Sequence, residues 1–216
     1  MKRIQVFEGR AAFAKAMITK YQSNFPNSKV SDIGSGWGNM KTIIEGAGLK
    51  WFPFDYVNKI DESIIWDLND PCPIENHKVG AVIFLEVLEH LSNPLLGIQN
   101  IANQMERGGI LILTTPNPAS SRNTIHFLLK GTLFAFQKKH LKEHHVFTPW
   151  RHIVEFFLIN QGFEIMEYAG VDYNYTKNQK RNWKEYLKRV IEKIVEYRNP
   201  LSKGMSYGIV AKKIID

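Results

Sequence analysis

Apolar residues form short runs along this chain, and the runs alternate with segments of helical periodicity. Val79–Leu85 is apolar almost throughout, which is typical of a strand covered on both faces. From Pro94 to Met105, apolar residues recur at the spacing of one helix face. This alternation predicts an α/β fold, a Rossmann-like, mostly parallel sheet with helices on both faces. The predicted strands are Lys29–Ile33, Lys50–Phe54, Ser63–Trp66, Val79–Leu85, Ile110–Thr115, Phe163–Ala169 and Ser206–Ile214.

Helices are predicted at Arg10–Tyr21, at Asn39–Glu45, from Pro94 and after Thr148-Pro149. Pro53 lies inside the second predicted strand, where it donates no hydrogen bond to a neighbouring strand. We therefore expect a local distortion of that strand.

Two long segments interrupt the alternation, although residues 1–216 otherwise predict a single domain. Residues 118–147 and 172–203 are both far longer than ordinary connections. The second segment contains a predicted amphipathic helix, Asn182–Tyr197, with Lys184, Lys188, Arg189 and Lys193 largely on its polar side. Insertions at the strand ends of α/β folds usually carry function.

The first insertion mixes apolar and cationic residues over Ser121–Phe136, including Arg122 and Lys130. Three interpretations fit this pattern: a lid over a substrate pocket, a helix on a membrane surface, or extra core packing.

Composition supports one globular domain: 44% of the 216 residues are hydrophobic and 23% are charged. The single Cys72 excludes an intramolecular disulfide and a multi-cysteine metal site. No apolar run reaches the roughly 18 residues of a membrane span, and the N-terminus has no signal-peptide pattern. We expect a cytoplasmic protein, with peripheral association at the inner face of the membrane as an alternative.

Charge is unevenly distributed along the chain, whose net charge is +7. Residues 1–119 carry 11 Lys and Arg against 12 Asp and Glu, whereas residues 120–216 carry 17 against 9. The basic second half indicates either an anionic partner, such as a lipid surface, nucleic acid or phosphorylated substrate, or simply a solvated surface.

The segment from Asp32 to Asn39 reads Asp-Ile-Gly-Ser-Gly-Trp-Gly-Asn between a predicted strand and a predicted helix. Gly34, Gly36 and Gly38 allow a sharp turn and a close approach of the backbone to a ligand. The following helix N-terminus presents free N–H groups to negative charge. The spacing differs from the G-x-G-x-x-G of dinucleotide folds.

Two further acids end predicted strands. Asp55 closes the second strand, where a carboxylate binds both hydroxyls of a ribose or caps a helix. Asp67-Leu68 closes the third strand, at the height of an adenine edge or within a turn.

Five motifs in order give the chain a resemblance to class I S-adenosylmethionine-dependent methyltransferases, which covers roughly Lys29–Ala169. Within that family it is most similar to the small-molecule enzymes of quinone and surface-polysaccharide pathways. The resemblance implies a seven-stranded sheet with the last strand antiparallel. The motifs are Asp32–Gly38, Asp55, Asp67–Asn69, Phe84–Leu91 and Gly108–Ile110 with Thr115–Asn117.

The resemblance also implies roles for individual residues. The methionine end of the cofactor is assigned to Asp32, Gly34, Ser35, Gly36 and Gly38, the ribose to Asp55, and the adenine to Asp67 and Leu68. Glu86 is assigned a place beside the methyl group and the amino-acid part.

Acids and histidines gather in two places in the sequence. Glu86, Glu89 and His90 follow the fourth predicted strand, and His140, His144 and His145 lie in the first insertion. Glu86, Glu89, His90 and His145 together suit a divalent cation. A similar set occurs in small-RNA 2′-O-methyltransferases and ubiquinone-pathway O-methyltransferases, where a His-x-Phe motif resembles His145-Val146-Phe147. Alternatively His145, or His144, is a general base without a metal, and Glu89 and His90 only brace the loop.

These features predict an S-adenosylmethionine-dependent methyltransferase that acts on a hydroxyl of a small molecule. The expected acceptor is a glycan or lipid-linked precursor of the cell surface. Two alternatives stay open: an RNA 2′-O-methyltransferase, and a non-catalytic cofactor-binding subunit of a larger assembly.

Overall fold

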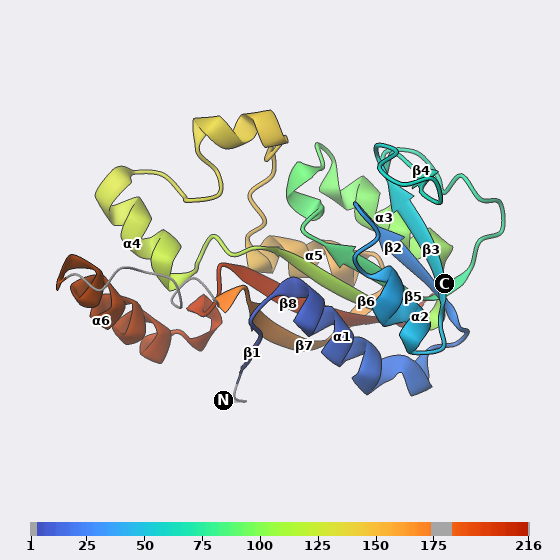
Figure 1. Ribbon diagram of the computed structural model, residues 1–216, viewed down its shortest axis with the longest axis horizontal. Coiled ribbons are helices and arrows are strands. Elements are labelled where there is room, and N and C mark those ends of the chain that lie inside the picture. Colours follow the sequence, from blue (N-terminus) through green and yellow to red (C-terminus); the bar gives the residue numbers. More distant parts are fainter. Residues whose placement is uncertain (1–3, 174–182, 216) are drawn as a thin grey trace.

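The computed structural model describes residues 4–173 and 183–215. Within them, one eight-stranded sheet has the order β1-β7-β8-β6-β5-β2-β3-β4 (Figure 1). All neighbouring strands are parallel except β8, which runs antiparallel to β6 and β7. The strands are β1 Gln5–Val6, β2 Lys29–Ile33, β3 Lys50–Asp55, β4 Ile64–Ile65, β5 Val79–Leu85, β6 Met105–Pro116, β7 Phe163–Val171 and β8 Ser206–Lys213.

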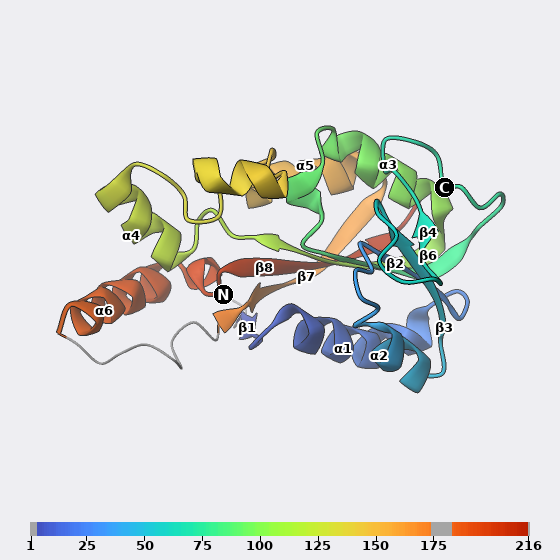
Figure 2. The same ribbon diagram turned by 45° about the horizontal axis from the view of Figure 1, so that its top comes forward.

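Helices cover both faces of the sheet, as Figure 2 shows. The α-helices are α1 Arg10–Tyr21, α2 Lys41–Gly46, α3 Pro94–Gln104, α4 Ser121–Lys130, α5 Arg151–Asn160 and α6 Trp183–Arg198. Short 3₁₀ turns lie at η1 Gln22–Asn24, η2 Leu88–His90, η3 Lys138–Glu143 and η5 Pro200–Ser202.

Alternate residues of the central strands enter two separate apolar clusters. In β5, Ala81 and Ile83 pack with α1, whereas Val82 and Phe84 pack with α3 and α5. Both faces are therefore buried, which is why β5 is apolar throughout. The Rossmann-like prediction and the antiparallel last strand are confirmed.

The sheet has one strand more than the predicted seven. The two-residue strand β1 pairs with β7 at the edge, Gln5 opposite Ala169 and Val6 opposite Gly170. Two residues are too few to show a period in the sequence, so the strand was not predictable from pattern.

The expected distortion at Pro53 is wrong, because β3 pairs with β2 in continuous register from Lys50 to Phe54. Lys50 donates its N–H to Ser28 and Phe54 accepts from Gly34, so the even-numbered residues bond to β2. Pro53 faces the other side, and β4 pairs only with Phe54 and Asp55. Its missing N–H therefore removes no bond of the ladder.

Both insertions are helical and leave the same edge of the sheet, the carboxyl end of the parallel strands. Residues 118–147 contain α4 and η3, and residues 172–203 contain α6 and η5 in their described part. The Ser120 hydroxyl caps α4 at Asn123, and Gly131 ends it at φ 68°. Figures 1 and 2 both draw α4 beside α6, at the opposite end of the molecule from α2.

None of the helices in these described ranges is long and apolar enough to cross a membrane.

Candidate active site

The glycine-rich turn follows β2, and all three of its glycines have positive φ, from 56° to 75°. A Cβ on Gly34 would lie 2.3 Å from Val87 Cγ2, and a Cβ on Gly38 would lie 3.3 Å from Ile60 Cδ1. A Cβ on Gly36 would meet only the carbonyl of Gly34, at 3.9 Å. Gly34 and Gly38 thus fit the turn against the protein, whereas Gly36 borders open space that a ligand can fill.

Asp55, at the end of β3, is joined directly to this turn. Its Oδ2 accepts the N–H of Gly36 at 2.8 Å, and its Oδ1 accepts the N–H of Val57 at 3.2 Å. The Lys59 ammonium lies 3.7 Å from Oδ2. The Asp55 carboxylate therefore lies beside Gly36, the glycine that borders open space. This position is compatible with the predicted contact between Asp55 and a ribose.

Asp32 lies deeper, at the base of the turn. Its side chain accepts the indole N–H of Trp51 at 2.9 Å and is 3% exposed. Burial raises the pKa of Asp32 to about 6, and the charge of Asp55 adds to the effect. Ser35, next in the turn, has a buried hydroxyl without a hydrogen-bond partner among the described residues. An unsatisfied buried hydroxyl fits a site completed by a ligand.

Asp67 and Leu68 lie beyond β4. The Asp67 carboxylate accepts both the backbone N–H and the side-chain amide of Asn69 at 2.9 Å, so it shapes a turn. Leu68 is buried, and its carbonyl accepts from the Asn100 amide at 2.9 Å. Their contact with an adenine stays a proposal.

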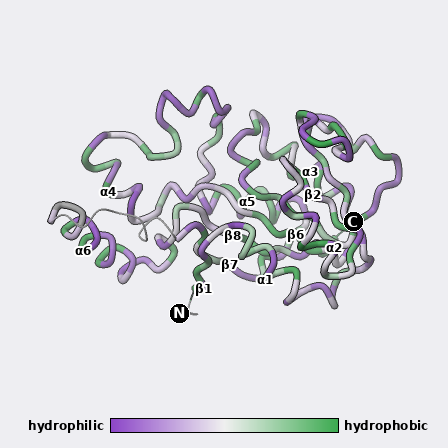
Figure 3. Tube along the Cα trace, viewed as in Figure 1, coloured by the Kyte–Doolittle hydropathy of each residue, from purple (hydrophilic) through white to green (hydrophobic). Residues whose placement is uncertain are grey.

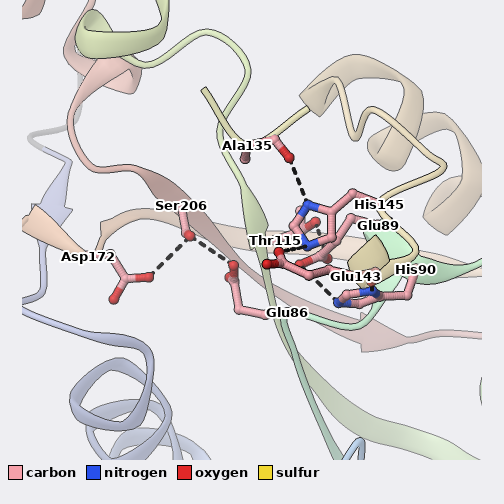
Figure 4. Close-up of polar contacts among 9 residues, drawn as sticks. All are labelled: Glu86, Glu89, His90, Thr115, Ala135, Glu143, His145, Asp172 and Ser206. Carbon is pink, nitrogen blue, oxygen red and sulfur yellow. Dashed lines mark hydrogen bonds and ion pairs between the residues drawn. The ribbon is translucent and has the colours of Figure 1, made fainter. Parts of the chain in front are cut away.

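Glu89, His90 and His145 form the most concentrated group of potential metal ligands in the described ranges. One ligand atom from each lies within 4.8 Å of the others, an arrangement that we call the Glu–His cluster (Figure 4). Glu89 is 1% exposed, and its Oε2 accepts the Thr115 hydroxyl at 3.0 Å. Its Oε1 lies 3.9 Å from His90 Nε2. Burial, followed by the charge of Glu86, raises the pKa of Glu89.

The insertion folds back onto this cluster and orients both imidazoles. Val146 and Phe147 donate their N–H groups to the Glu89 carbonyl at 3.0 and 3.1 Å. His90 Nδ1 lies 2.6 Å from the Glu143 carbonyl, and His145 Nδ1 lies 2.8 Å from the Ala135 carbonyl. Because a carbonyl only accepts, Nδ1 is the donor in each ring, and a neutral ring then has its lone pair on Nε2. His145 Nε2 also lies 3.8 Å from Glu143 Oε2. Metal-binding histidines are commonly oriented in this way.

Glu86 does not join the cluster, so the structure brings together three of the four predicted metal ligands. Its backbone has φ 55°, and its Oε2 accepts the Ser206 hydroxyl at 3.1 Å. Ser206 also lies 3.2 Å from Asp172 Oδ2, and Figure 4 shows Glu86 turned toward this pair. Glu86 Oε1 is buried and finds no hydrogen-bond partner in the described part of the chain. Burial, and then the charge of Asp172, raises the pKa of Glu86.

His144 is separated from the cluster as well. It occupies a left-handed position, φ 57°, at the end of η3, and its side chain is exposed. Of the two candidate bases, the structure therefore places only His145 beside Glu89.

Sequence reasoning named Thr115 only as part of a motif and missed Ser206 and Asp172. Thr115 donates to Glu89, and Ser206 contacts both Glu86 and Asp172. Ser206 lies 120 positions from Glu86 along the chain, so no local pattern linked them.

Comparison with known proteins gives the family. Residues 7–157 match the family model described as a methyltransferase domain. A ubiquinone biosynthesis O-methyltransferase of Rickettsia prowazekii is 29% identical over 183 residues, 78% of this chain and 71% of that protein. The protein of the same name from Rickettsia canadensis is 24% identical over 179 residues, 77% of this chain and 74% of the relative.

A solved structure shares the fold. A SAM-dependent methyltransferase from Archaeoglobus fulgidus superposes with a TM-score of 0.58 at 20% identity, covering 94% of both chains. The open space at Gly36, the orphaned Ser35 hydroxyl and the adjacent Asp55 carboxylate fit S-adenosylmethionine. The chain belongs to the methyltransferase-domain family and is an S-adenosylmethionine-dependent methyltransferase of the small-molecule type.

Proposed function

We propose that this enzyme methylates the oxygen of a hydroxylated small molecule, with a divalent cation held by Glu89, His90 and His145. The observation that carries the proposal is the convergence of the three ligand atoms within 4.8 Å. Glu89 is a buried acid with no lysine or arginine bonded to it among the described contacts. A buried carboxylate facing two free imidazole lone pairs is a favourable place for a cation.

The donor set indicates which ions fit. Two imidazole nitrogens and one carboxylate oxygen suit Mn²⁺, Fe²⁺ or Zn²⁺ better than Mg²⁺, which prefers oxygen ligands. Burial lowers the pKa of His90, so its ring is neutral and able to bind a metal at neutral pH.

The acceptor atom is proposed from the relatives. Both Rickettsia proteins are named O-methyltransferases, which favours a hydroxyl over an amine or a carbon. Their names place them in ubiquinone biosynthesis and give no support to a glycan. They give no support to the lipid-linked cell-surface precursor either, so the proposal keeps only a hydroxylated small molecule as the acceptor.

The chain's own residues divide the work. When bound, S-adenosylmethionine supplies a methyl group that its sulfonium charge has already activated, and a divalent cation supplies positive charge beside the acceptor hydroxyl. The Gly36 turn and Asp55 hold the donor, and the insertion fixes His145 beside Glu89. With the cation bound, His145 Nε2 would be one of its ligands, and the proton of the acceptor hydroxyl, made more acidic by the cation, would pass to water. Without a metal, the same Nε2 would be the base that receives that proton.

Chelation tests this proposal. We expect the enzyme to form S-adenosylhomocysteine with a catechol as the probe acceptor, to lose this activity after EDTA and dialysis, and to regain it with Mn²⁺. Full activity after chelation, combined with loss of activity in His145→Ala, would assign His145 as a base acting without a metal.

RNA 2′-O-methylation is the second candidate, since the same cluster and the basic second half are compatible with it. Metal-dependent methylation of a short RNA, without activity on the catechol, would favour it.

A further inference from the structure

Helix α6 has an unusual orientation: two of its acids, Glu192 and Glu196, are buried, and many of its large apolar side chains are exposed. Glu192 and Glu196 are only 8% and 6% exposed. The exposed apolar side chains, which we call the α6 apolar face, are Tyr186, Leu187, Val190, Ile191, Ile194 and Tyr197, from 38% to 86% exposed. Figure 3 shows hydrophobic and hydrophilic residues interleaved along this helix. An ordinary surface helix has the opposite arrangement.

The buried contacts of α6 explain this orientation. Glu196 Oε1 accepts the Ser121 hydroxyl of α4 at 3.0 Å, and its Oε2 accepts the Tyr173 hydroxyl at 3.0 Å. The helix is thus held by hydrogen bonds on its polar side. These bonds fix the α6 apolar face away from the domain.

Helix α4, which packs against α6, repeats the pattern. Two of its three buried residues, Ser121 and Asn123, are polar, and the third is Ile125. Asn123 donates to the Asn117 carbonyl at 2.7 Å and accepts from Phe134 N–H at 2.8 Å. Its last turn presents Phe127, Leu128 and Leu129, from 54% to 78% exposed. Two neighbouring helices therefore expose apolar residues at one end of the molecule, beyond the scattered exposure that is normal for a monomer.

The charges around the exposed apolar residues of α4 and α6 indicate which partner binds there. Lys130 at the end of α4 and Lys193 and Arg198 on α6 are exposed beside the apolar residues. Lys138, Lys139 and Lys142 of η3, in the same insertion as α4, are exposed too. The half of the chain that contains both helices has 17 Lys and Arg against 9 Asp and Glu. A second copy would bring the same positive charge to the contact, and RNA would leave the apolar side chains in water.

We propose that α6, together with the last turn of α4, docks on an anionic lipid bilayer. Apolar and aromatic side chains enter the boundary between headgroups and acyl chains, and the flanking cations bind the anionic headgroups. Both helices leave the carboxyl end of the sheet, the edge that carries the Gly36 turn and the Glu–His cluster. Docking therefore places the lipid at the α4 and α6 end of this sheet edge. This proposal does not depend on the metal or on the acceptor proposed above.

Vesicle sedimentation of the 216-residue chain tests the docking. The probe is an equimolar mixture of phosphatidylcholine and phosphatidylglycerol, with pure phosphatidylcholine as the neutral comparison. We expect binding to the anionic vesicles that weakens at high salt, and little binding to the neutral ones. Replacing Leu187, Ile191 and Ile194 together by Ser lowers the partition coefficient by about tenfold or more.

Matched variants test whether a loss of binding comes only from removing exposed apolar residues in general or from misfolding. Phe156→Ser with Ile159→Ser removes apolar side chains of similar exposure, 58% and 60%, from α5, and we expect unchanged partition. Lys193→Glu with Arg198→Glu weakens binding to the anionic vesicles alone. Calorimetric affinity for S-adenosylmethionine stays at the wild-type value in every variant, which shows that the domain is folded.

Three results would overturn the proposal. They are unchanged partition of the triple Ser variant, equal binding to neutral and anionic vesicles, and a wild type that binds neither vesicle. A concentration-dependent dimer that the triple variant disperses would assign the surface to a second copy instead, and salt-sensitive RNA binding lost in Lys193→Glu with Arg198→Glu would assign it to RNA.

Discussion

The Gly36 turn and the Glu–His cluster both lie at the carboxyl edge of the sheet, but they are assembled over different lengths of chain. Gly36 and Asp55, joined by a hydrogen bond, are 19 positions apart and follow adjacent parallel strands. His90 and Glu143, also joined by a hydrogen bond, are 53 positions apart and meet only because the insertion folds back. The donor side is thus part of the sheet, whereas the acceptor side depends on a long, separately folded segment.

This difference means that changes in the insertion should affect the two regions differently. The turn is fixed by buried strands, so changes in the insertion leave it intact. The Glu–His cluster needs the backbone bonds from Val146 and Phe147 to Glu89, so changes in the insertion alter turnover without altering donor affinity. Variants in the turn and in the insertion should therefore have separable effects on donor affinity and turnover.

Gly36→Val carries the largest expected effect. The new side chain enters the open space beside Asp55, so we expect the affinity for S-adenosylmethionine to fall by about 100-fold or more, measured by calorimetry. Gly48→Val is the matched control, because Gly48 has φ 76° and open surroundings away from the site. It shares the backbone strain, and equal affinity losses in the two variants would mean that strain, not occupation of the site, is responsible.

His145→Ala is expected to lower turnover by roughly 100-fold or more while donor affinity stays near the wild-type value. The exposed neighbour provides the comparison: His144→Ala should leave both quantities unchanged. Steady-state kinetics with the catechol probe measures both variants. Normal turnover in His145→Ala would remove this residue from the reaction.

Asp55→Asn should weaken donor binding by about tenfold, because an amide is a poorer acceptor for ribose hydroxyls and for Gly36 N–H. Asp67→Asn should have a smaller effect, since Asp67 is engaged with Asn69. Calorimetry at one pH compares the two. The reverse order would move the main contact from Asp55 to Asp67.

Asp32→Asn should change the pH dependence of stability, which is measured separately from the cofactor role assigned to Asp32. Burial raises the pKa of Asp32 from 3.8 to about 6, so between these values the folded state holds a proton that the unfolded state has lost. Stability from this group is therefore present below about pH 4, falls as pH rises to about 6, and is constant above. Asn removes this pH dependence and stabilises the protein at pH 7 by about 3 kcal/mol.

Urea unfolding of both proteins from pH 4 to pH 7 measures the difference. Parallel pH profiles for the wild type and Asp32→Asn would show that burial does not perturb this carboxyl.

Local signals predicted most of the fold. The bounds of α1, Arg10–Tyr21, follow from an Ala-rich run that begins after Gly9, and β5 follows from its unbroken apolar sequence. The short strand β1 and the undistorted pairing at Pro53 depend on the neighbouring strands. The sequence pattern of a single strand does not show which strands are its neighbours.

The site was predictable to the extent that its parts are local. The Gly36 turn and Asp55 were predicted from their positions at the ends of strands. Glu86 and Glu89 were predicted to bind one cation together because they are close in sequence. Glu86 has a left-handed backbone and η2 begins only at Leu88, so the two side chains diverge. Ser206, which donates to Glu86, begins the last strand, and Asp172, which accepts from Ser206, directly follows β7. Only the tertiary structure brings these residues together.

Mn²⁺ binding tests the central claim of a metal-dependent acceptor side most directly. Electron paramagnetic resonance of the wild-type protein titrated with Mn²⁺ should show one bound ion per chain. Glu89→Gln should lose this ion because a neutral amide replaces the buried carboxylate, while Gly36→Val keeps it. Absence of bound Mn²⁺ in the wild type, or equal binding in Glu89→Gln, would contradict the account.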